Sequence, residues 1–359
     1  MWELRKHPGD RMVPAERERA LAAGEAFDRL PCTLSLGEFK APLLGVNFSD
    51  LVRDEETMVR AEIHAFNRFG ADSISMGANS YGIAEAMGAN VCYPENKLPY
   101  IAAPVLTDYS MLDDMRPMEP MKDGRVSLYM KACKALAERA EGIVELHSSV
   151  GGPFTIASYL RGTENLMRDV HRHPAEVRRL LKLVTQSMKR CVDAFAPWNV
   201  RIAMADPVAS GNMISPQAFR EFVFPCLKEV MDYAFRQTGK KVTFHLCGKT
   251  ERIWPDLLKL KMERFSVDER IDLAGARSFL GGAMKIAGNV PPVEVLLNGK
   301  REDIFQAVKG CVDLCAGSPG GFILAPGCQV SPATPAGNLD DYMEAARVYC
   351  GYDYVKQYL

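Results

Sequence analysis

The sequence predicts an α/β protein with the architecture of a (β/α)8 TIM barrel and an N-terminal helical extension. Short apolar or β-branched runs recur along the chain, longer amphipathic segments separate them, and about eight such runs can be counted. Parallel strands joined by helices give this alternation, and eight β/α units close a barrel. We expect residues 1–40 to form the extension and residues 41–359 to form one barrel domain.

The expected strands are short runs that end close to polar residues. In chain order they are 42–48, 71–77, 142–148, 200–206, 241–247, 263–269, 284–289 and 321–327. The intervening segments 55–69 and 173–195 repeat apolar residues at helical spacing. Because the loops that follow the strands of such a barrel build its active site, polar strand ends are candidate functional positions. These ends carry Asn47, Asn79, Glu145, His147, Asp206, His245, Cys247, Asp268, Glu269, Asn289 and Cys328.

The composition excludes several classes of partner. The 359 residues include 44 Lys and Arg against 45 Asp and Glu, so no basic field is present to attract nucleic acid or an anionic membrane. The N-terminal region lacks the apolar core of a signal peptide, and no apolar run is long enough to span a membrane. We expect a cytoplasmic protein whose ten scattered cysteines are thiols.

A metal site is predicted at the end of the strand 241–247. Side chains two apart on a strand point to the same side, so His245 and Cys247 can face one ion. Cys328 follows the last expected strand at the same end of the barrel and supplies a third ligand. Imidazole and thiolate ligands suit Zn²⁺, and three protein ligands leave a catalytic position open. The alternative is that the three are unrelated core and loop residues.

Other candidates have a functional and a structural interpretation each. Glu269 is a possible fourth zinc ligand or an ion-paired glutamate, and His147, two residues after Glu145, is a possible donor to a substrate oxygen or a packed histidine. Asp206 could orient a ligand or a neighbouring loop, and Tyr81 could stack on a substrate. We interpret Cys311 and Cys315, four apart on an amphipathic segment, as core residues.

Several segments resemble the uroporphyrinogen decarboxylase superfamily of (β/α)8 barrels. They include "GPFTIASYLRG", "ADPVASGNMISPQAFREFVFPCLKEV" and "AGNVPPVEVLLNGKREDI", whereas "HLCG" together with "APGCQV" resembles its zinc-dependent corrinoid methyltransferases. In that branch the matching histidine and two cysteines bind zinc. The resemblance therefore implies a zinc-dependent methyltransferase that works with a corrinoid protein. That partner would be a separate chain, because no Asp-x-His-x-x-Gly pattern for cobalamin binding is found here.

The resemblance to the decarboxylases themselves is weaker at two positions. Their arginine-rich loop after the first strand corresponds here to "GVNFSDLVRDEETM", which has one arginine, Arg53, among acids. Aligning residues 85–88, "EAMG", with the family's Glu-Ala-Leu-Gly places Asn79 where decarboxylases carry a catalytic aspartate. An amide carries no charge to offset a pyrrole cation, so decarboxylation is disfavoured.

The methyl donor or acceptor is left open between two chemistries. Zinc could stabilise the oxygen that leaves a methyl ether, as in O-demethylation, or lower the pKa of a thiol of the coenzyme M type. Methoxylated aromatics are favoured, because Asn79, Tyr81 and His147 can hydrogen-bond or stack and no arginine cluster is apparent. A non-catalytic binding barrel is the remaining alternative.

Overall fold

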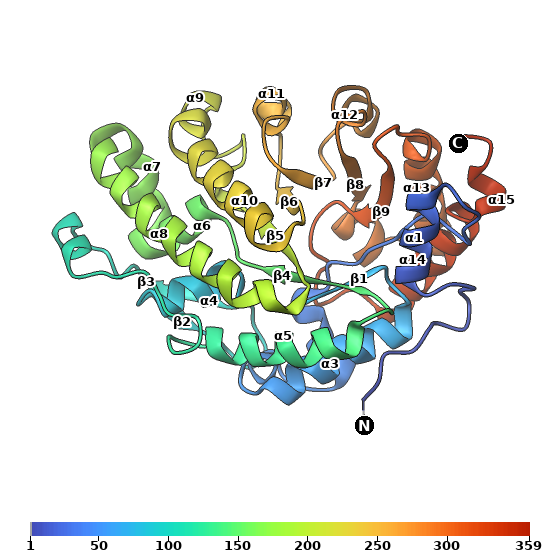
Figure 1. Ribbon diagram of the computed structural model, residues 1–359, viewed down its shortest axis with the longest axis horizontal. Helices are drawn as coiled ribbons and strands as arrows, with labels where there is room; N and C mark the ends of the chain where they lie inside the picture. The colour runs from blue at the N-terminus through green and yellow to red at the C-terminus, as the bar shows by residue number, and fades with distance from the viewer. Residues whose placement is uncertain (1) are drawn as a thin grey trace.

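One curled parallel sheet forms the centre of the computed structural model, which describes residues 2–359. Its strands follow one another in chain order around the sheet, and the helices lie outside them (Figure 1). The strands are β1 (Ser73–Ser75), β4 (Glu145–Ser149), β5 (Arg201–Ala205), β6 (Val242–Leu246), β7 (Met262–Val267), β8 (Lys285–Val290) and β9 (Phe322–Pro326). Each pairs in parallel with its neighbour, as the barrel prediction requires.

Most of the expected elements are confirmed, and one strand is wrong. The helical segments 55–69 and 173–195 form α3 (Glu55–Phe69) and α8 (Pro174–Phe195). The run 42–48 is not a strand: it contains the end of helix α2 (Lys40–Leu44), which stops at Gly45 with a φ of 76°. A short apolar run fits a strand or a helix equally well by periodicity, and here the glycine cap and the helical turn before it decide the outcome.

The eighth position of the barrel is filled by residues 31–33 instead. The backbone N–H of Thr33 donates to the carbonyl of Leu324 in β9, and the N–H of Leu324 donates to the carbonyl of Pro31. On the other side, the N–H of Asp72, just before β1, donates to the carbonyl of Cys32. This extended segment therefore lies between β9 and β1, inside the range that we expected to be a helical extension.

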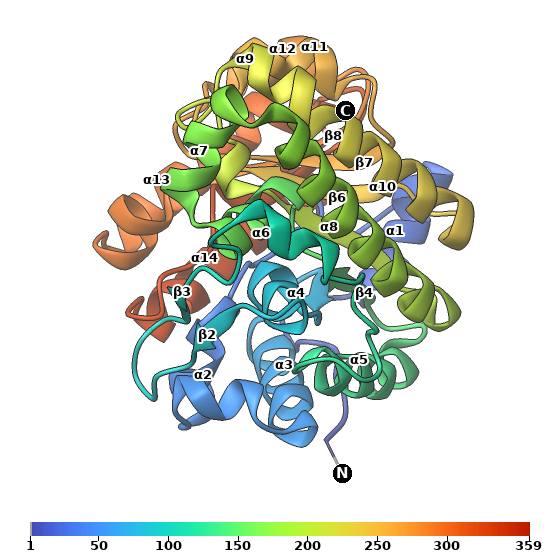
Figure 2. The same cartoon turned by 90° about the vertical axis from the view of Figure 1, so that its left-hand side faces the viewer.

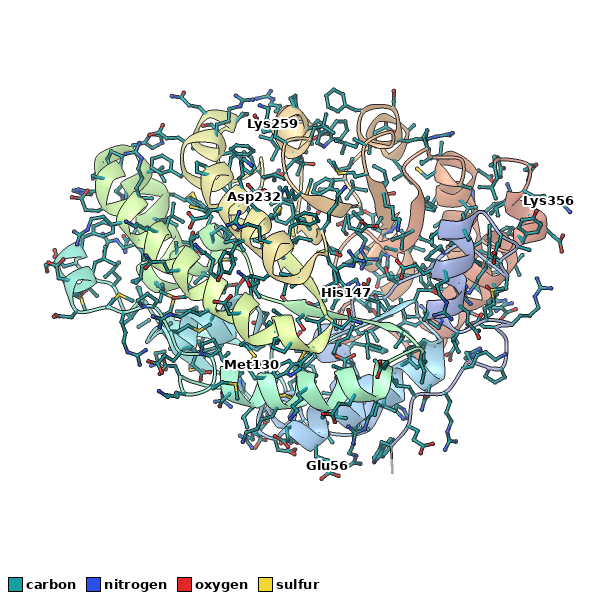
Figure 3. The ribbon with its side chains drawn as sticks, viewed as in Figure 1. Glu56, Met130, His147, Asp232, Lys259 and Lys356 are labelled. Carbon is teal, nitrogen blue, oxygen red and sulfur yellow. The ribbon has the colours of Figure 1, made fainter. Side chains whose placement is uncertain are left out.

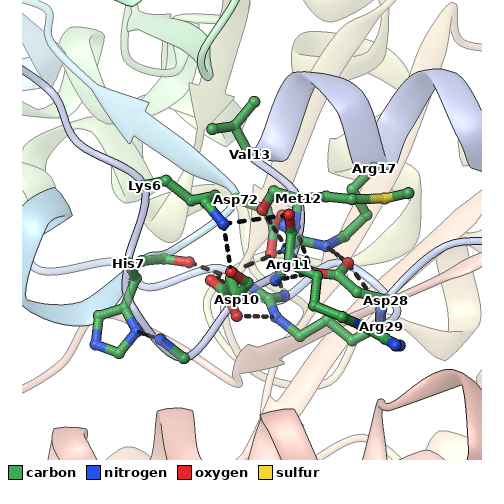
Figure 4. Close-up of polar contacts among 12 residues, drawn as sticks. Lys6, His7, Asp10, Arg11, Met12, Val13, Arg17, Asp28, Arg29 and Asp72 are labelled. Carbon is green, nitrogen blue, oxygen red and sulfur yellow. Dashed lines mark hydrogen bonds and ion pairs between the residues drawn. The ribbon is translucent and has the colours of Figure 1, made fainter.

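Buried ion pairs fix that segment in place. Arg29 is 2% exposed and contacts Asp10 at 3.1 Å and Asp72 at 2.5 Å, while Arg17 pairs with Asp28 at 2.7 Å (Figure 4). The carboxylate of Asp72 also accepts a hydrogen bond from the backbone N–H of Cys32 at 2.7 Å. These contacts tie Asp72, just before β1, to Arg29 and to the backbone of the closing segment.

The remaining helices cover the outside of the sheet. Figure 2 shows α3 and α5 at one edge of the molecule and α9, α11 and α12 at the opposite edge, as in Figure 1. A short antiparallel hairpin, β2 (Asn90–Cys92) with β3 (Tyr100–Ala103), was not expected from the sequence. No helix within residues 2–359 combines the length and the hydropathy that a bilayer crossing needs. The other α-helices are α1 (Pro14–Ala23), α4 (Asn79–Ala86), α5 (Val126–Ala140), α6 (Pro153–Arg161), α7 (Thr163–Arg172), α9 (Pro216–Ala218), α10 (Phe224–Thr238), α11 (Trp254–Leu257), α12 (Leu273–Leu280), α13 (Arg301–Cys315), α14 (Ala336–Tyr349) and α15 (Tyr352–Val355).

Candidate functional site

A cavity of about 450 Å³ opens inside the barrel. Side chains alternate along each strand, and those that face the barrel interior are mostly small, whereas barrels of this type usually fill their interior with bulky branched residues. The small strand residues in its lining are Ser73, Ser75, Ser149, Ala203, Ala205, Thr243, Ser266, Ala287 and Ala325. Small interior residues leave the space that a ligand could occupy.

His245, Cys247 and Cys328 meet in the wall of this cavity. Their ligating atoms all lie within 4.8 Å of one another, with 3.3 Å between Nε2 of His245 and Sγ of Cys247 and 3.9 Å between the two sulfurs. Around a tetrahedral Zn²⁺ with bonds of about 2.0 to 2.3 Å, ligand atoms lie roughly 3.5 to 3.8 Å apart. The three side chains therefore fit a zinc ion with little movement and leave a fourth position open.

Neighbouring residues orient the first two ligands. Nδ1 of His245 donates to the carbonyl oxygen of Ser266 at 3.1 Å, which turns Nε2 toward the sulfurs. The chain turns sharply after Cys247 at Gly248, whose φ is 68°, and its N–H donates to Asp268 at 2.7 Å. Metal-binding histidines in proteins commonly donate their second nitrogen to a carbonyl or carboxylate in this way.

The contacts within the cluster favour a thiolate. The hydrogen bond that Cys247 donates to Cys328 holds the pKa of the Cys328 thiol below its usual range, and His245 adds to this effect. The same contact raises the pKa of Cys247. Burial alone would lower the pKa of His245, but the Cys328 sulfur, the Ser266 carbonyl and Asp268 together raise it above its usual value. The thiolate is the form of cysteine that binds metals, and the lowered pKa of Cys328 favours this form.

Glu269 lies next to this cluster but outside it. Its carboxylate is not among the ligating atoms within 4.8 Å of one another, although its backbone packs against Gly327, the residue before Cys328. Oε2 of Glu269 is buried and has no hydrogen-bond partner among the described residues. A buried oxygen without a partner is costly, so a cation beside it would be stabilising.

Asn79 and Tyr81 occupy different surroundings at the start of α4. Asn79 lines the cavity, and its Oδ1 accepts hydrogen bonds from the N–H groups of Tyr81 at 2.9 Å and Gly82 at 3.4 Å. Tyr81 is not part of the cavity lining; its ring stacks on that of Tyr159 with 4.7 Å between centroids. The structure therefore brings Asn79, but not Tyr81, to the cavity.

Glu145 and His147 lie deep in the barrel rather than at its mouth. Glu145 begins β4 instead of lying near its end, and it contacts Arg201 at 2.7 Å outside the cavity lining. His147 lines the cavity and lies near the middle of the molecule (Figure 3). Both of its ring nitrogens are engaged, Nε2 with Glu145 at 3.1 Å and Nδ1 with Arg264 at 2.9 Å. The expected position of Glu145 at a strand C-terminus is wrong, because β4 starts three residues later than expected.

Asp206 is fully buried and acts on a neighbouring helix. Its carboxylate accepts hydrogen bonds from the N–H groups of Phe154 at 3.1 Å and Thr155 at 2.7 Å and from the Thr155 hydroxyl at 2.6 Å. These donors lie in the first turn of α6, so Asp206 supplies acceptors that the helix start lacks. Asp206 is not part of the cavity lining. We expected it to orient either a ligand or a neighbouring loop, and the geometry matches the second role, because Asp206 holds the start of a helix and the loop before it.

Arg264 of β7 lines the cavity, although it was not among the site residues expected from the sequence. Its position two residues before Ser266 on the same strand gives it the same facing as the residues around the metal cluster. The alternation of side chains along β7 could have indicated that Arg264 faces the interior. Candidate residues were expected at strand ends, however, and Arg264 lies in the middle of its strand. Cys311 and Cys315 are buried on α13, away from the cavity, as expected of core residues.

Known proteins with similar sequences include methyltransferases and uroporphyrinogen decarboxylases. A methylcobamide:CoM methyltransferase of Methanosarcina acetivorans is 26% identical over 94% of this chain and 98% of its own length. A uroporphyrinogen decarboxylase of Anaeromyxobacter is 25% identical over 87% of this chain and 90% of its own. A solved methyltransferase from Methanosarcina mazei superposes with a TM-score of 0.83 at 23% identity, covering 94% of this chain and 99% of its own, which shows the shared fold.

The family model supports the same relationship along nearly the whole barrel. The model described as uroporphyrinogen decarboxylase (URO-D) matches residues 14–349, a range that includes the closing segment 31–33, all strands of the sheet and the three clustered ligands. With the barrel and this match in agreement, the chain belongs to the uroporphyrinogen decarboxylase (URO-D) family.

Proposed function

We propose that this chain is a zinc-dependent methyltransferase that moves a methyl group between a small molecule and the cobalt of a corrinoid carried by a partner protein. The observation that carries the proposal is the cluster of His245, Cys247 and Cys328, which has the spacing of three tetrahedral ligands in the wall of a cavity. A relative that is 26% identical is named a methylcobamide:CoM methyltransferase, which supports the reaction class.

Each residue of the cluster has a definite task in this proposal. His245 presents an Nε2 lone pair because Ser266 accepts the proton of Nδ1, and Cys247 and Cys328 bind as thiolates. Bound zinc would supply Lewis acidity at the heteroatom of the substrate. Glu269, with its unpartnered Oε2, is proposed as the fourth ligand of the resting site, to be displaced when substrate binds.

We favour a thiol as the acceptor of the methyl group. From the sequence we favoured a methoxylated aromatic, partly because no arginine cluster was apparent, but in the fold one arginine, Arg264, lines the cavity. In transfer to a thiol, sulfur bonds to the methyl carbon as the bond from that carbon to cobalt breaks. The electron pair of the broken bond stays on cobalt, and the thiol proton goes to solvent.

A methyl ether is the second candidate. The cavity is also lined by the rings of Phe48, Phe66 and Tyr129, and its volume of about 450 Å³ is large enough for one aromatic ring. In this direction cobalt would take the methyl group and the ether oxygen would leave as an alkoxide or phenoxide. The two candidates differ in whether thiols or ethers support turnover.

Decarboxylation of a porphyrinogen is disfavoured on two grounds. Asn79, at the position of the catalytic aspartate, carries no charge to stabilise a cation. Residues 34–47, which follow the closing segment 31–33, contain Lys40 and no arginine to bind several carboxylates. Neither this loop nor the segment 45–58, which was expected to correspond to it, contains an arginine cluster.

The decisive experiment combines metal analysis with a transfer assay. Protein purified without chelator should contain one zinc per chain, and it should demethylate methylcobalamin or a methylated corrinoid protein when thiols are supplied. A panel of methoxylated aromatics offered with a reduced corrinoid protein tests the second candidate. The proposal fails if the protein holds no zinc, or if chelation leaves turnover unchanged. Equal rates with free cobalamin and with every corrinoid protein would remove the partner from the proposal.

A further inference from the structure

The floor of the cavity contains a cation without a counter-ion. The guanidinium of Arg264 faces the cavity, and its one hydrogen bond within residues 2–359 goes from Nη2 to Nδ1 of His147 at 2.9 Å. No carboxylate of those residues lies within ion-pairing distance of it. Arginine carries five N–H donors, so most of the donors of this side chain are left for a ligand.

Of the carboxylates whose charge acts on Arg264, Glu18 is exposed to solvent, and Glu145 and Glu263 are already engaged. Glu145 contacts Arg201 at 2.7 Å and His147 at 3.1 Å, and Glu263 pairs with Lys285 at 2.8 Å. The other cation of the cavity, Lys40, is paired with Glu62. Arg264 therefore gives the floor an uncompensated positive charge, and burying such a charge is unfavourable unless an anion joins it.

His147 holds this guanidinium as a neutral acceptor. Arg264 donates to Nδ1, so the ring proton lies on Nε2, which donates to Glu145. Burial lowers the pKa of His147 to about 4, and the Arg264 cation acts in the same direction. A neutral imidazole at neutral pH accepts from the arginine without repelling it, which fixes the direction in which the guanidinium points.

We propose that Arg264, positioned by His147, binds the anionic end of the substrate whose reacting heteroatom lies at His245, Cys247 and Cys328. This inference rests on the proposed function and adds to it the residue that determines specificity. The geometry places Arg264 two residues before Ser266 on β7, about 6.6 Å along the strand, and Ser266 contacts His245. Both sites line one cavity, so a short bifunctional molecule with a carboxylate or sulfonate could reach both.

Binding of anions that lack a thiol tests the role of Arg264 without any turnover. Titration calorimetry with ethanesulfonate and propionate, on protein stripped of metal, should show binding to the wild type. Arg264→Met should weaken that binding by about 10- to 100-fold, the effect expected for a lost charge-assisted hydrogen bond. Arg220→Met is the matched control, because Arg220 pairs with Asp256 at 2.7 Å outside the cavity lining. It should leave binding unchanged.

Turnover then separates this inference from the proposed function. The wild type should prefer 2-mercaptoethanesulfonate over the neutral 2-mercaptoethanol, and Arg264→Met should abolish the preference through KM while zinc content stays unchanged. If Arg264→Met does not fold, Arg264→Lys should fold and show intermediate anion affinity. Equal anion binding by wild type and Arg264 variants, or turnover without preference for the anionic thiol, would overturn the inference and leave the methyltransferase intact. Arg264-dependent anion binding in a protein without transferase activity would sustain the inference and reject the function.

Discussion

Nδ1 of His245 lies 3.1 Å from the carbonyl oxygen of Ser266, so that Nε2 faces Sγ of Cys247 at 3.3 Å. The two residues are register partners on β6 and β7, and the pairing of those strands therefore sets the orientation of the imidazole. Strand pairing, rather than a flexible loop, positions the histidine of the proposed metal centre. Rigid elements hold such sites more precisely than loops.

Zinc content should separate the cluster cysteines from the helix cysteines. Cys247→Ala and Cys328→Ala should lose the metal, because two ligands hold zinc far more weakly than three. Cys311→Ala and Cys315→Ala should keep it, since both thiols are buried on α13. Metal analysis of the four variants at equal protein concentration checks this. Loss of zinc on changing Cys311 would show that the ligands are assigned wrongly.

Acid should destabilise the fold through His147. Burial and Arg264 lower its pKa to about 4 in the folded protein, so the unfolded chain, with a value of about 6.5, takes up the proton first. The contribution is present above pH 6.5 and is lost as the pH falls toward 4, by up to about 3 kcal/mol. Urea unfolding at pH 7 and at pH 4.5 measures the loss. His147→Gln should show a smaller difference between the two, and a ring titration near pH 6.5 by NMR would contradict the prediction.

Filling the cavity should impair binding while the metal stays. Ala203→Leu would place a larger side chain among the small residues of the cavity lining, at a cost of about 1 to 3 kcal/mol in folding if the space cannot adapt. We expect weaker binding of thiols and anions, with zinc content as in the wild type. Ala203→Ser, which adds one small atom, is the control for the position. Unchanged affinity in the leucine variant would show that ligands bind elsewhere.

Removing Arg29 should destabilise the closed barrel. Arg29→Met leaves Asp10 and Asp72 buried with less compensation, and the loss of one partner from a buried ion pair typically costs about 3 to 5 kcal/mol. Urea unfolding gives the change in the free energy of unfolding. Arg68→Met removes an arginine that pairs with Asp340 at the surface and should cost under about 1 kcal/mol. Equal effects of the two changes would mean that the buried cluster is not stabilising the closure.

The sequence by itself determined what depends on local periodicity. The alternation of strand and helix patterns predicted the barrel and, apart from 42–48, its strands. The spacing of hydrophobic residues, on which these predictions depend, can be read directly from the sequence. The spacing of His245 and Cys247 likewise placed both on one strand face, and Cys328 at the end of the last strand completed the group. The strands and the His245–Cys247 pair needed only local spacing, whereas adding Cys328 also needed the expectation that a barrel brings its strand ends together.

Tertiary structure decided what depends on barrel closure. Residues 31–33 became the closing segment because β9, Asp72 and the buried ion pairs hold them there, and three residues are too few for a periodic pattern. Glu145 lies at the N-terminal end of β4, where it contacts Arg201. Its depth in the barrel depends on the residue at which β4 starts. Arg264 became part of the cavity only because small side chains on other strands leave its guanidinium uncovered, a property of the closed interior that one strand's sequence does not contain.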